Sequence, residues 1–192
     1  MGSAEAVVTP TATTPPPSVA KARITAASLE LFARHGVGGT SLQMIADRVG
    51  VTKAAVYHQF KTKDEIVLAA AEAELARIEV VLDKAEVERT RARARQVMLG
   101  GIVDFAVEGR RTSNVILSDP VVLRFFSGHE RYLRMVDRLN ELLMGADNKT
   151  DDRVQTVLFM AAISGAVMHP MVADLDDETL RAQLLRLARR FR

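Results

Sequence analysis

The sequence predicts an all-α protein, and three observations support this prediction. Apolar residues recur at spacings of three and four along most of the chain, which is the period of an amphipathic helix. Ser, Thr or Asp precedes several of these stretches and Gly or Pro follows them, as at helix starts and ends. No stretch shows the clear alternation of a β-strand. We expect about nine helices in all.

The composition is that of a globular protein. The chain has 192 residues, of which 48% are hydrophobic and 26% are charged. It contains no cysteine, which excludes disulfides, thiolate catalysis and cysteine-ligated zinc. We find neither an apolar run of membrane-spanning length nor a signal peptide, and we therefore expect a cytoplasmic protein without a membrane partner.

The chain begins with a stretch that does not predict a helix. Residues 1–17 are rich in Thr, Ala and Pro and end in a triple proline, so we interpret them as a disordered arm. The first helix is expected from about Val19 to His35, with an apolar stripe that includes Leu31 and Phe32. Three glycines between residues 36 and 39 end it.

Two short helices joined by a tight turn are predicted next. Thr40 and Gln43 have the spacing of a capping box at the start of the first. Gly50 stands where a helix C-cap belongs, and Thr52 is the expected N-cap of the second. In this second helix the inward positions are Val56 and Phe60, and the outward positions are Lys53, Ala54, Tyr57 and His58.

Positive charge is concentrated in this part of the chain. The whole sequence carries a net charge of +2, whereas Ser18 to Lys63 contains seven basic and two acidic residues, a net charge of +5. Such a distribution is typical of a surface that meets a phosphate backbone. Together with the two short helices and their glycine turn, it indicates a helix-turn-helix.

The same residues resemble the DNA-binding core of the TetR family of bacterial transcriptional regulators. The resemblance is carried by G-G-T-S-L-Q-M-I-A, V-G-V-T-K-A-A-V-Y-H-Q-F and K-T-K-D-E-I. It is specific over about Ile24 to Leu68, and beyond that only the length and the helical pattern are similar. The resemblance implies a three-helix helix-turn-helix DNA-binding domain at residues 18–66. A helical effector-binding and dimerisation domain is implied at residues 67–192.

Lys53 is the best candidate for a base contact. It lies in the first turn of the recognition helix and can donate to guanine, while Ala54 leaves room for a thymine methyl. A helix-turn-helix used only for packing is the alternative, and the basic outward face argues against it. The complete predicted set of DNA-contacting residues is Thr40, Ser41, Gln43, Thr52, Lys53, Ala54, Tyr57, His58, Lys61 and Lys63.

Three other segments have two interpretations each. Lys21 and Arg23 either reach phosphates or form ordinary solvated surface. The arm at residues 1–17 could enter a minor groove, but it contains no Lys or Arg, which favours the disordered interpretation. The four arginines from Arg89 to Arg95 suggest nucleic acid, but their spacing fits neither a groove nor one helix face, so a solvated surface is favoured.

The remainder of the chain predicts longer helices. One begins near Asp64, and another spans Gln96 to Glu108, where a pair of glycines indicates either a close neighbouring helix or a cavity. A short helix is expected around residues 112–117. A long one should then run from Pro120 to about Met144 with Asp119 as its N-cap. The last two helices are expected at about residues 151–168 and 177–191.

Two further sites follow from the resemblance. In the family the last two long helices pair with those of a second copy, although the same apolar residues would also suit the protein's own core. The predicted interface is Val157, Ala161, Gly165, Leu180, Leu184, Leu187 and Phe191. The family's pocket lies among the middle helices, where His129 is either a ligand contact or a core residue. The predicted pocket residues are Leu99, Ile102, Phe105, Phe125, Phe126, His129, Tyr132, Phe159 and Ile163.

No enzyme motif was found. The sequence has no glycine-rich phosphate loop, nucleophile elbow or metal-spaced histidine cluster, so we expect no catalytic activity, metal or cofactor. An architectural DNA binder would need basic surface along the whole chain. The resemblance therefore leads us to predict a homodimeric repressor that a small, mostly apolar ligand releases from a palindromic double-stranded operator. The alternative is a DNA-binding regulator or activator without a small-molecule effector.

Overall fold

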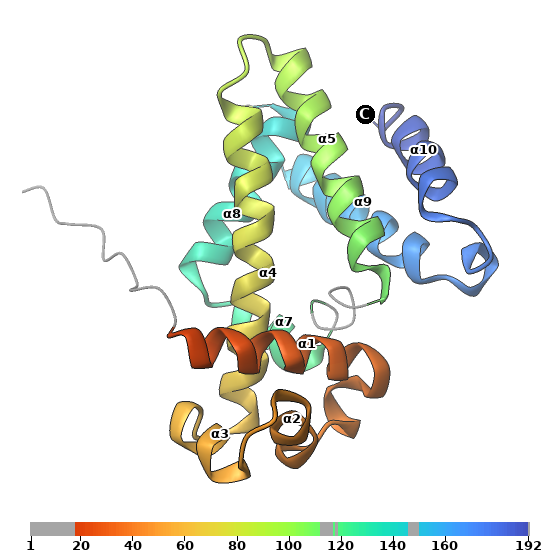
Figure 1. Ribbon diagram of the computed structural model, residues 1–192. Coiled ribbons are helices and arrows are strands. Elements are labelled where there is room, and N and C mark those ends of the chain that lie inside the picture. The colour runs from red at the N-terminus through yellow and green to blue at the C-terminus, as the bar shows by residue number, and fades with distance from the viewer. Residues whose placement is uncertain (1–17, 112–116, 118, 146–149, 192) are drawn as a thin grey trace, which may run out of the picture.

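The computed structural model describes residues 18–111, 117, 119–145 and 150–191, and these residues form an all-α fold (Figure 1). The predicted arm and most of the short helix expected at residues 112–117 lie outside this description. Nine α-helices and two 3-10 turns are described, which confirms the predicted fold class. The elements are α1 (Val19–Gly39), α2 (Leu42–Val49), α3 (Lys53–Gln59), α4 (Lys63–Glu86), α5 (Arg91–Glu108), η1 (Gly109–Arg111), α7 (Pro120–Phe126), α8 (Glu130–Met144), α9 (Thr150–Met168), η2 (Pro170–Val172) and α10 (Asp177–Ala188).

The first three helices pack together at one end of the molecule, with the beginning of α4 among them (Figure 1). Phe32 of α1, Ile45 of α2 and Val56 of α3 are fully buried in their shared core. The first helix keeps regular geometry as far as His35, as predicted. It is interrupted at Gly36, where φ is +70°. Glycine takes this left-handed conformation without the steric cost that a Cβ would add.

α4 joins this end of the molecule to the rest. It is a single helix of 24 residues, about 36 Å long at 1.5 Å per residue. It packs against α1 near its start and against α5, α7 and α8 further along. The predicted boundary between residues 66 and 67 falls inside α4, between the buried residues Ile66 and Val67. The two predicted domains are therefore joined by a continuous helix rather than by a linker.

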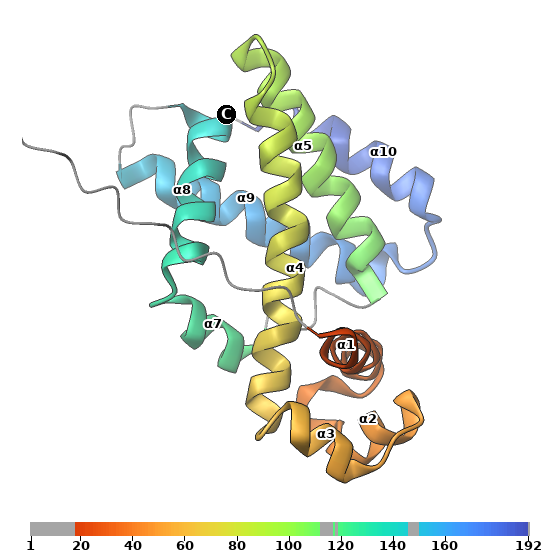
Figure 2. The ribbon, with the colours of Figure 1, turned by 60° about the vertical axis from the view of Figure 1, so that its left-hand side comes forward.

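The remaining helices surround the second half of α4. Figure 2 shows α7 and α8 on one side of it and α5 and α10 on the other. Gly101 explains how closely α4 and α5 approach, because a Cβ at this position would lie 2.8 Å from Cγ2 of Val81 and still closer to its Cγ1. The predicted close approach of a helix at the glycine pair is therefore confirmed at Gly101.

Three side-chain contacts attach α8 to α4. Glu72, Glu79 and Glu86 recur every seven residues and so lie along one face of α4. Their partners, in the same order, are His129, Arg131 and Arg138. The Arg131 guanidinium donates to both carboxylate oxygens of Glu79, at 2.9 and 2.6 Å, which fixes its orientation as well as its distance.

The single long helix predicted from Pro120 to Met144 is wrong. The chain forms α7, turns at residues 127–129 and starts again as α8. Gly128 lies in this turn, and the Ser127 hydroxyl donates to the carbonyl of Arg124, which offers the backbone an alternative to helix. The break shifts the buried face. In α8, Leu133 is 46% exposed, whereas Met135, Leu139 and Leu143 point into the core.

The arginines at the start of α5 are not simply a solvated face. Arg91 donates to the carbonyl of Met144 at the end of α8. Arg95 donates to Leu143 O at 3.2 Å and to Phe191 O at 2.5 Å. Cations are favourable at helix C-termini, where carbonyls lack intrahelical partners. Arg91 is exposed, in agreement with the predicted solvated surface, whereas Arg95 is half-buried. The guanidinium groups of both also satisfy carbonyls at the ends of other elements.

Candidate nucleic-acid interface

α2 and α3 form a helix-turn-helix in which three residues cap the ends of the helices. Ser41 is the N-cap of α2 and accepts a hydrogen bond from the Met44 N–H at 3.2 Å. Gly50 ends α2 in the left-handed conformation, with φ at +78°. Thr52 caps α3 by accepting from the Ala55 N–H at 3.1 Å. The glycine C-cap and the Thr52 N-cap are confirmed as predicted.

The predicted capping role of Thr40 is wrong. The Thr40 hydroxyl donates to the carbonyl of Gly36 at 2.9 Å, and only 2% of the residue is exposed. Ser41, the next residue, is the N-cap instead. Because its hydroxyl is buried and already engaged, Thr40 is not placed to meet a phosphate.

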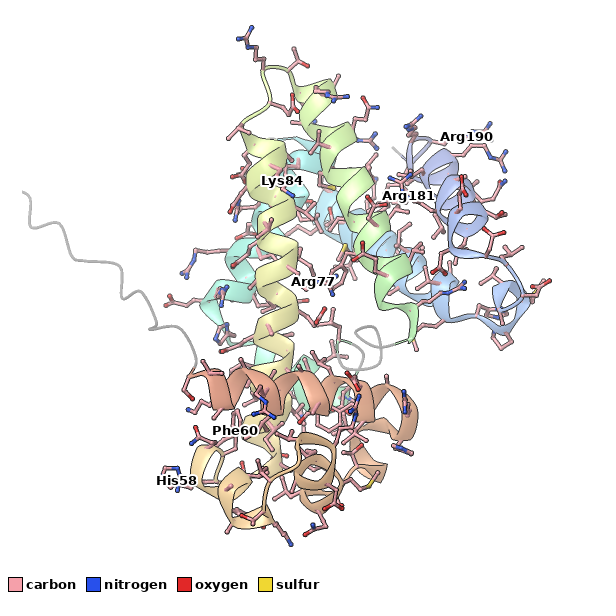
Figure 3. All side chains as sticks on the ribbon, in the orientation of Figure 1. His58, Phe60, Arg77, Lys84, Arg181 and Arg190 are labelled. Atoms are coloured by element: carbon pink, nitrogen blue, oxygen red, sulfur yellow. The ribbon has the colours of Figure 1, made fainter. Side chains whose placement is uncertain are left out.

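α3 presents its outward side as the sequence predicts. Val56 and Phe60 are buried, so the side of the helix that carries Lys53, Tyr57 and His58 faces solvent. The Lys53 ammonium lies 5.8 Å from the centroid of the Tyr57 ring, within reach of a cation–π interaction. Figure 3 shows His58 pointing away from the body of the protein, at its helix-turn-helix end. The α3 surface thus combines a cation, an aromatic hydroxyl and an imidazole.

Three other polar side chains in this unit hold the scaffold together. The Lys63 ammonium donates to the carbonyls of Val37, at 2.6 Å, and Thr40, at 3.1 Å. The Gln43 amide donates to the Asp47 carboxylate at 2.7 Å. Arg23 donates to the carbonyl at the end of α2, that of Val49, at 3.2 Å. Lys63 and Arg23 therefore serve the connections between helices, and Lys63 is a weaker phosphate candidate than its charge suggested.

Gln59 belongs to this surface although it was not predicted. Its amide lies 3.2 Å from Nδ1 of His58, and its carbonyl oxygen accepts from the Ser18 hydroxyl at 3.3 Å. It thereby orients His58 and holds the start of α1 against the end of α3. The only signal in the sequence was its position directly after His58. The predicted DNA-contacting residues that are exposed are Ser41, Gln43, Thr52, Lys53, Ala54, Tyr57, His58 and Lys61.

Residues 24–70 match the family model described as bacterial regulatory proteins, tetR family. Residues 24–70 therefore form a TetR-family DNA-binding domain. A curated relative is the uncharacterized HTH-type transcriptional regulator YerO of Bacillus subtilis (strain 168), which is 42% identical over 52 residues. This match spans 27% of the present chain and only 18% of YerO. The sequence similarity therefore covers the helix-turn-helix and the start of α4.

Solved structures extend the similarity from residues 24–70 to the whole fold. AibR, in complex with isovaleryl coenzyme A and operator DNA, superposes with a TM-score of 0.69 at 18% identity, covering 88% of this chain and 97% of AibR. The fatty acid degradation regulator FadR from Bacillus halodurans gives a TM-score of 0.71 at 14% identity, covering 89% and 95%. At these identities the comparison shows a common fold and nothing more specific.

The C-terminal helices α9 and α10 leave an apolar face uncovered. Val157 and Leu158 of α9 are 61% and 58% exposed, and Ala161 and Gly165 lie on the same exposed side. Leu187 of α10 is also exposed. These residues are available to a second copy, as predicted for Val157, Ala161, Gly165 and Leu187.

Three other predicted interface residues point inward. Leu180 and Leu184 are buried in the protein's own core, where α10 packs against α5 and α9. Phe191 is half-buried, and its ring centroid lies 5.2 Å from that of Phe159. The assignment of Leu180 and Leu184 to an interface is therefore wrong. The regular leucine stripe of α10 serves the packing within one protomer.

The predicted pocket residues pack mainly against one another. The rings of Phe126 and Tyr132 are stacked with centroids 4.7 Å apart, and Phe125 lies 4.9 Å from the His129 ring. Phe105 of the predicted set lines a cavity between α4 and α5. Burial raises the pKa of the Tyr132 phenol, which keeps it protonated and able to donate a hydrogen bond.

His129 has one engaged and one unengaged ring nitrogen. Its Nε2 lies 3.6 Å from a carboxylate oxygen of Glu72 on α4. Its Nδ1 is buried and has no hydrogen-bond partner within the described residues. A ligand that offered a donor or an acceptor here would satisfy this atom, so the predicted ligand role of His129 stays a prediction.

Other kinds of site find no support in the described residues. No group of three or more His, Cys, Asp or Glu is placed to hold a metal ion in the described ranges. None of the helices that the structure describes is both long and apolar enough to cross a membrane.

Proposed function

We propose that this TetR-family protein is a sequence-specific DNA-binding transcription regulator that acts as a homodimer. The observation that carries the proposal is the exposed side of α3, with Lys53, Tyr57 and His58 on a segment of net charge +5. A recognition helix in this position enters the major groove with its N-terminal residues, and Lys53 occupies the first turn. Its ammonium is then placed to donate to guanine O6 and N7.

The dimer is proposed from the uncovered apolar face of α9 and α10. A palindromic operator requires two recognition helices about 34 Å apart, and a two-fold dimer provides them. Val157, Leu158 and Leu187 offer the apolar area that such an interface buries. The charged residues of α3 lie at the opposite end of α4, so a dimer of this kind leaves both recognition helices free.

We further propose that the protein is a repressor and that a small, mostly apolar molecule releases it from its operator. One neighbour in fold, AibR, was solved with both isovaleryl coenzyme A and operator DNA. The middle helices here supply aliphatic and aromatic side chains, with His129 and Tyr132 as polar groups, a lining that suits an apolar ligand. Such a ligand must bind the DNA-incompetent form more tightly, and tenfold release needs a difference of about 1.4 kcal/mol.

A regulator or activator without a small-molecule effector is the second candidate. The observation that favours it is the stacking of the Phe126 ring on the Tyr132 ring, because these side chains then fill space that an effector would need. A panel of hydrophobic compounds, scored for thermal stabilisation and for operator release, separates the two. Release by at least one compound supports the repressor. No stabilisation and no release across the panel supports the second candidate.

DNA recognition is tested by one substitution and one matched control. After operator selection from random DNA, Lys53→Ala should lose about 1–3 kcal/mol of cognate affinity and relax preference at one base position in each half-site. Arg124→Ala also removes an exposed cation, but on α7, and should leave affinity unchanged. Titrations over a salt series measure both. Unchanged cognate affinity in Lys53→Ala would refute the placement of α3 in the groove.

A further inference from the structure

The outer side of α5 is hollowed between α4 and α10. Two adjoining cavities, of about 320 and 330 Å³, share Val97, Gly101 and Asp104 of α5. The first extends to α10 and the second to α4. Figure 3 shows Arg77 and Lys84 on α4 and Arg181 on α10, on the two sides of α5. We call this continuous hollow the α5 groove. Each half has the size of a small-ligand site.

At Gly100 the floor of the α5 groove is formed by helix backbone, because no side chain of the described residues fills the space there. A Cβ at Gly100 would meet nothing within 4 Å, so the backbone of α5 is open to the groove at this point. Val97 and Leu185 lie beside it in the first cavity, and Phe105 lies in the second. An aliphatic or aromatic group of a ligand would therefore rest on apolar surface and helix backbone.

The rim of the α5 groove is basic. Five cations and two carboxylates line the two cavities, a net charge of +3. Arg181 neutralises Asp104, and Arg77 binds Glu108 at 2.8 Å. The remaining three cations are Lys84, Arg93 and Arg189.

Within the described residues, few carboxylates compete with an anionic ligand for these three cations. Neither Lys84 nor Arg189 forms an ion pair with any residue that the structure describes. The one carboxylate partner of Arg93 in that part of the chain, Glu88, lies 3.7 Å away. Arg93 and Arg189 line the same cavity.

The α5 groove stays open in the proposed dimer. Arg181, Leu185 and Arg189 are four residues apart on α10 and therefore face one side of that helix. Leu187 is two residues from Leu185, about 200° around the helix, and faces the opposite side. A second copy that covers Leu187 and the exposed side of α9 would leave the groove accessible.

We propose that the α5 groove binds an anionic amphiphile. Its apolar part rests on Val97, Leu185 and the Gly100 backbone, and its phosphate or carboxylate group is bound by Arg93 and Arg189. Guanidinium groups form strong, directional hydrogen bonds with both kinds of anion. This ligand class differs from the apolar effector expected among the middle helices, because the cations of α5 and α10 converge here and not there. The site does not depend on the proposed DNA-binding function.

Calorimetric titration of the purified full chain, without DNA, tests the site. The probes are octyl phosphate and octanoate, which distinguish the two head groups, with octan-1-ol and inorganic phosphate as their separate halves. At least one charged amphiphile should bind about tenfold more tightly than octanol or phosphate alone. Only such a molecule contacts both the apolar floor and the basic rim of the groove. Absence of binding up to about 1 mM by both charged probes, or equal binding of octanol, overturns the proposal.

Two variants and a control localise the binding. The double variant Arg93→Ala/Arg189→Ala should bind the charged probe about tenfold or more weakly. Gly100→Leu should also weaken binding, because the leucine side chain would cover the floor of the groove. Arg190→Ala also removes an arginine from the end of α10, but one outside the groove lining, and should bind as the wild type does. Melting temperatures establish that each variant is folded. If the double variant and Arg190→Ala bind the charged probe with equal affinity, the site is refuted. A negative result in the Lys53 test of DNA recognition would not bear on this site.

Discussion

The two adjacent glycines of α5 allow a sharp test of the packing between α4 and α5. Replacing glycine by alanine inside a helix stabilises it by about 0.5–1 kcal/mol when space allows. At Gly100 the new methyl meets nothing within 4 Å, so Gly100→Ala should gain this amount. At Gly101 the methyl would lie 2.8 Å from Cγ2 of Val81, whose branched side chain is stiff. Overpacking of this kind costs about 1–3 kcal/mol, so Gly101→Ala should be destabilising.

Urea unfolding at one protein concentration measures both variants. We expect their free energies of unfolding to differ by about 2 kcal/mol, or about 4–8 °C in melting temperature for a chain of this size. Val81→Ala removes the clashing methyls, so the double variant Gly101→Ala/Val81→Ala should be more stable than the sum of its single changes. Equal stabilities of Gly100→Ala and Gly101→Ala would show that α4 and α5 are not packed as described.

Three further predictions concern the interface, the helix-turn-helix and one helix cap. Val157→Glu/Leu158→Glu should turn a micromolar dimer into a folded monomer in sedimentation velocity. Val157 and Leu158 of the two copies together bury four such side chains in the dimer, which contributes about 4–6 kcal/mol. Wild-type protein that sediments as a monomer would contradict this prediction. Lys63→Ala removes the donor to two carbonyls and should lower the free energy of unfolding in urea by about 1–2 kcal/mol, whereas Lys61→Ala should change it little. The pKa of Asp176 lies below its ordinary value because the Thr179 N–H and hydroxyl donate to its carboxylate. Its stabilisation of α10 is therefore present at neutral pH and lost as the pH falls through the lowered pKa. Asp176→Ala should flatten the acid side of a stability–pH series, and an unchanged profile would exclude the cap.

Local signals in the sequence predicted the helix-turn-helix well. Gly50 and Thr52 are caps whose effect depends on the backbone within a few residues, so the sequence alone contains the information. Val56 and Phe60 gave the buried side of α3, and with it the exposed side that carries Lys53. The prediction of Thr40 as the cap of α2 was wrong, although the neighbouring Ser41 also has a hydroxyl group. The Thr40 hydroxyl donates instead to the carbonyl of Gly36, four residues earlier.

Features that depend on distant residues could not be predicted in this way. The periodicity of α10 showed an apolar stripe but not whether Leu184 would meet its own protomer or a second copy. Arg91 and Arg95 looked like a solvated charge run, because the carbonyls that they bind belong to residues about 50 or more positions away. The break between α7 and α8 follows from Gly128 and Ser127, which are weak signals within a strong helical pattern.

The continuity of α4 makes it a lever arm. Its first turns are built into the core of the helix-turn-helix, and its last turns are attached to α8 by the contacts of Glu79 and Glu86. A tilt of only about 5° over a rigid length of about 36 Å displaces the far end by about 3 Å. In a dimer both arms move, and the separation of two recognition helices changes by up to about 6 Å, nearly two base-pair steps of 3.4 Å. In the proposed dimer, a small displacement where α8 contacts α4 would be magnified by this geometry into a mismatch with the period of DNA.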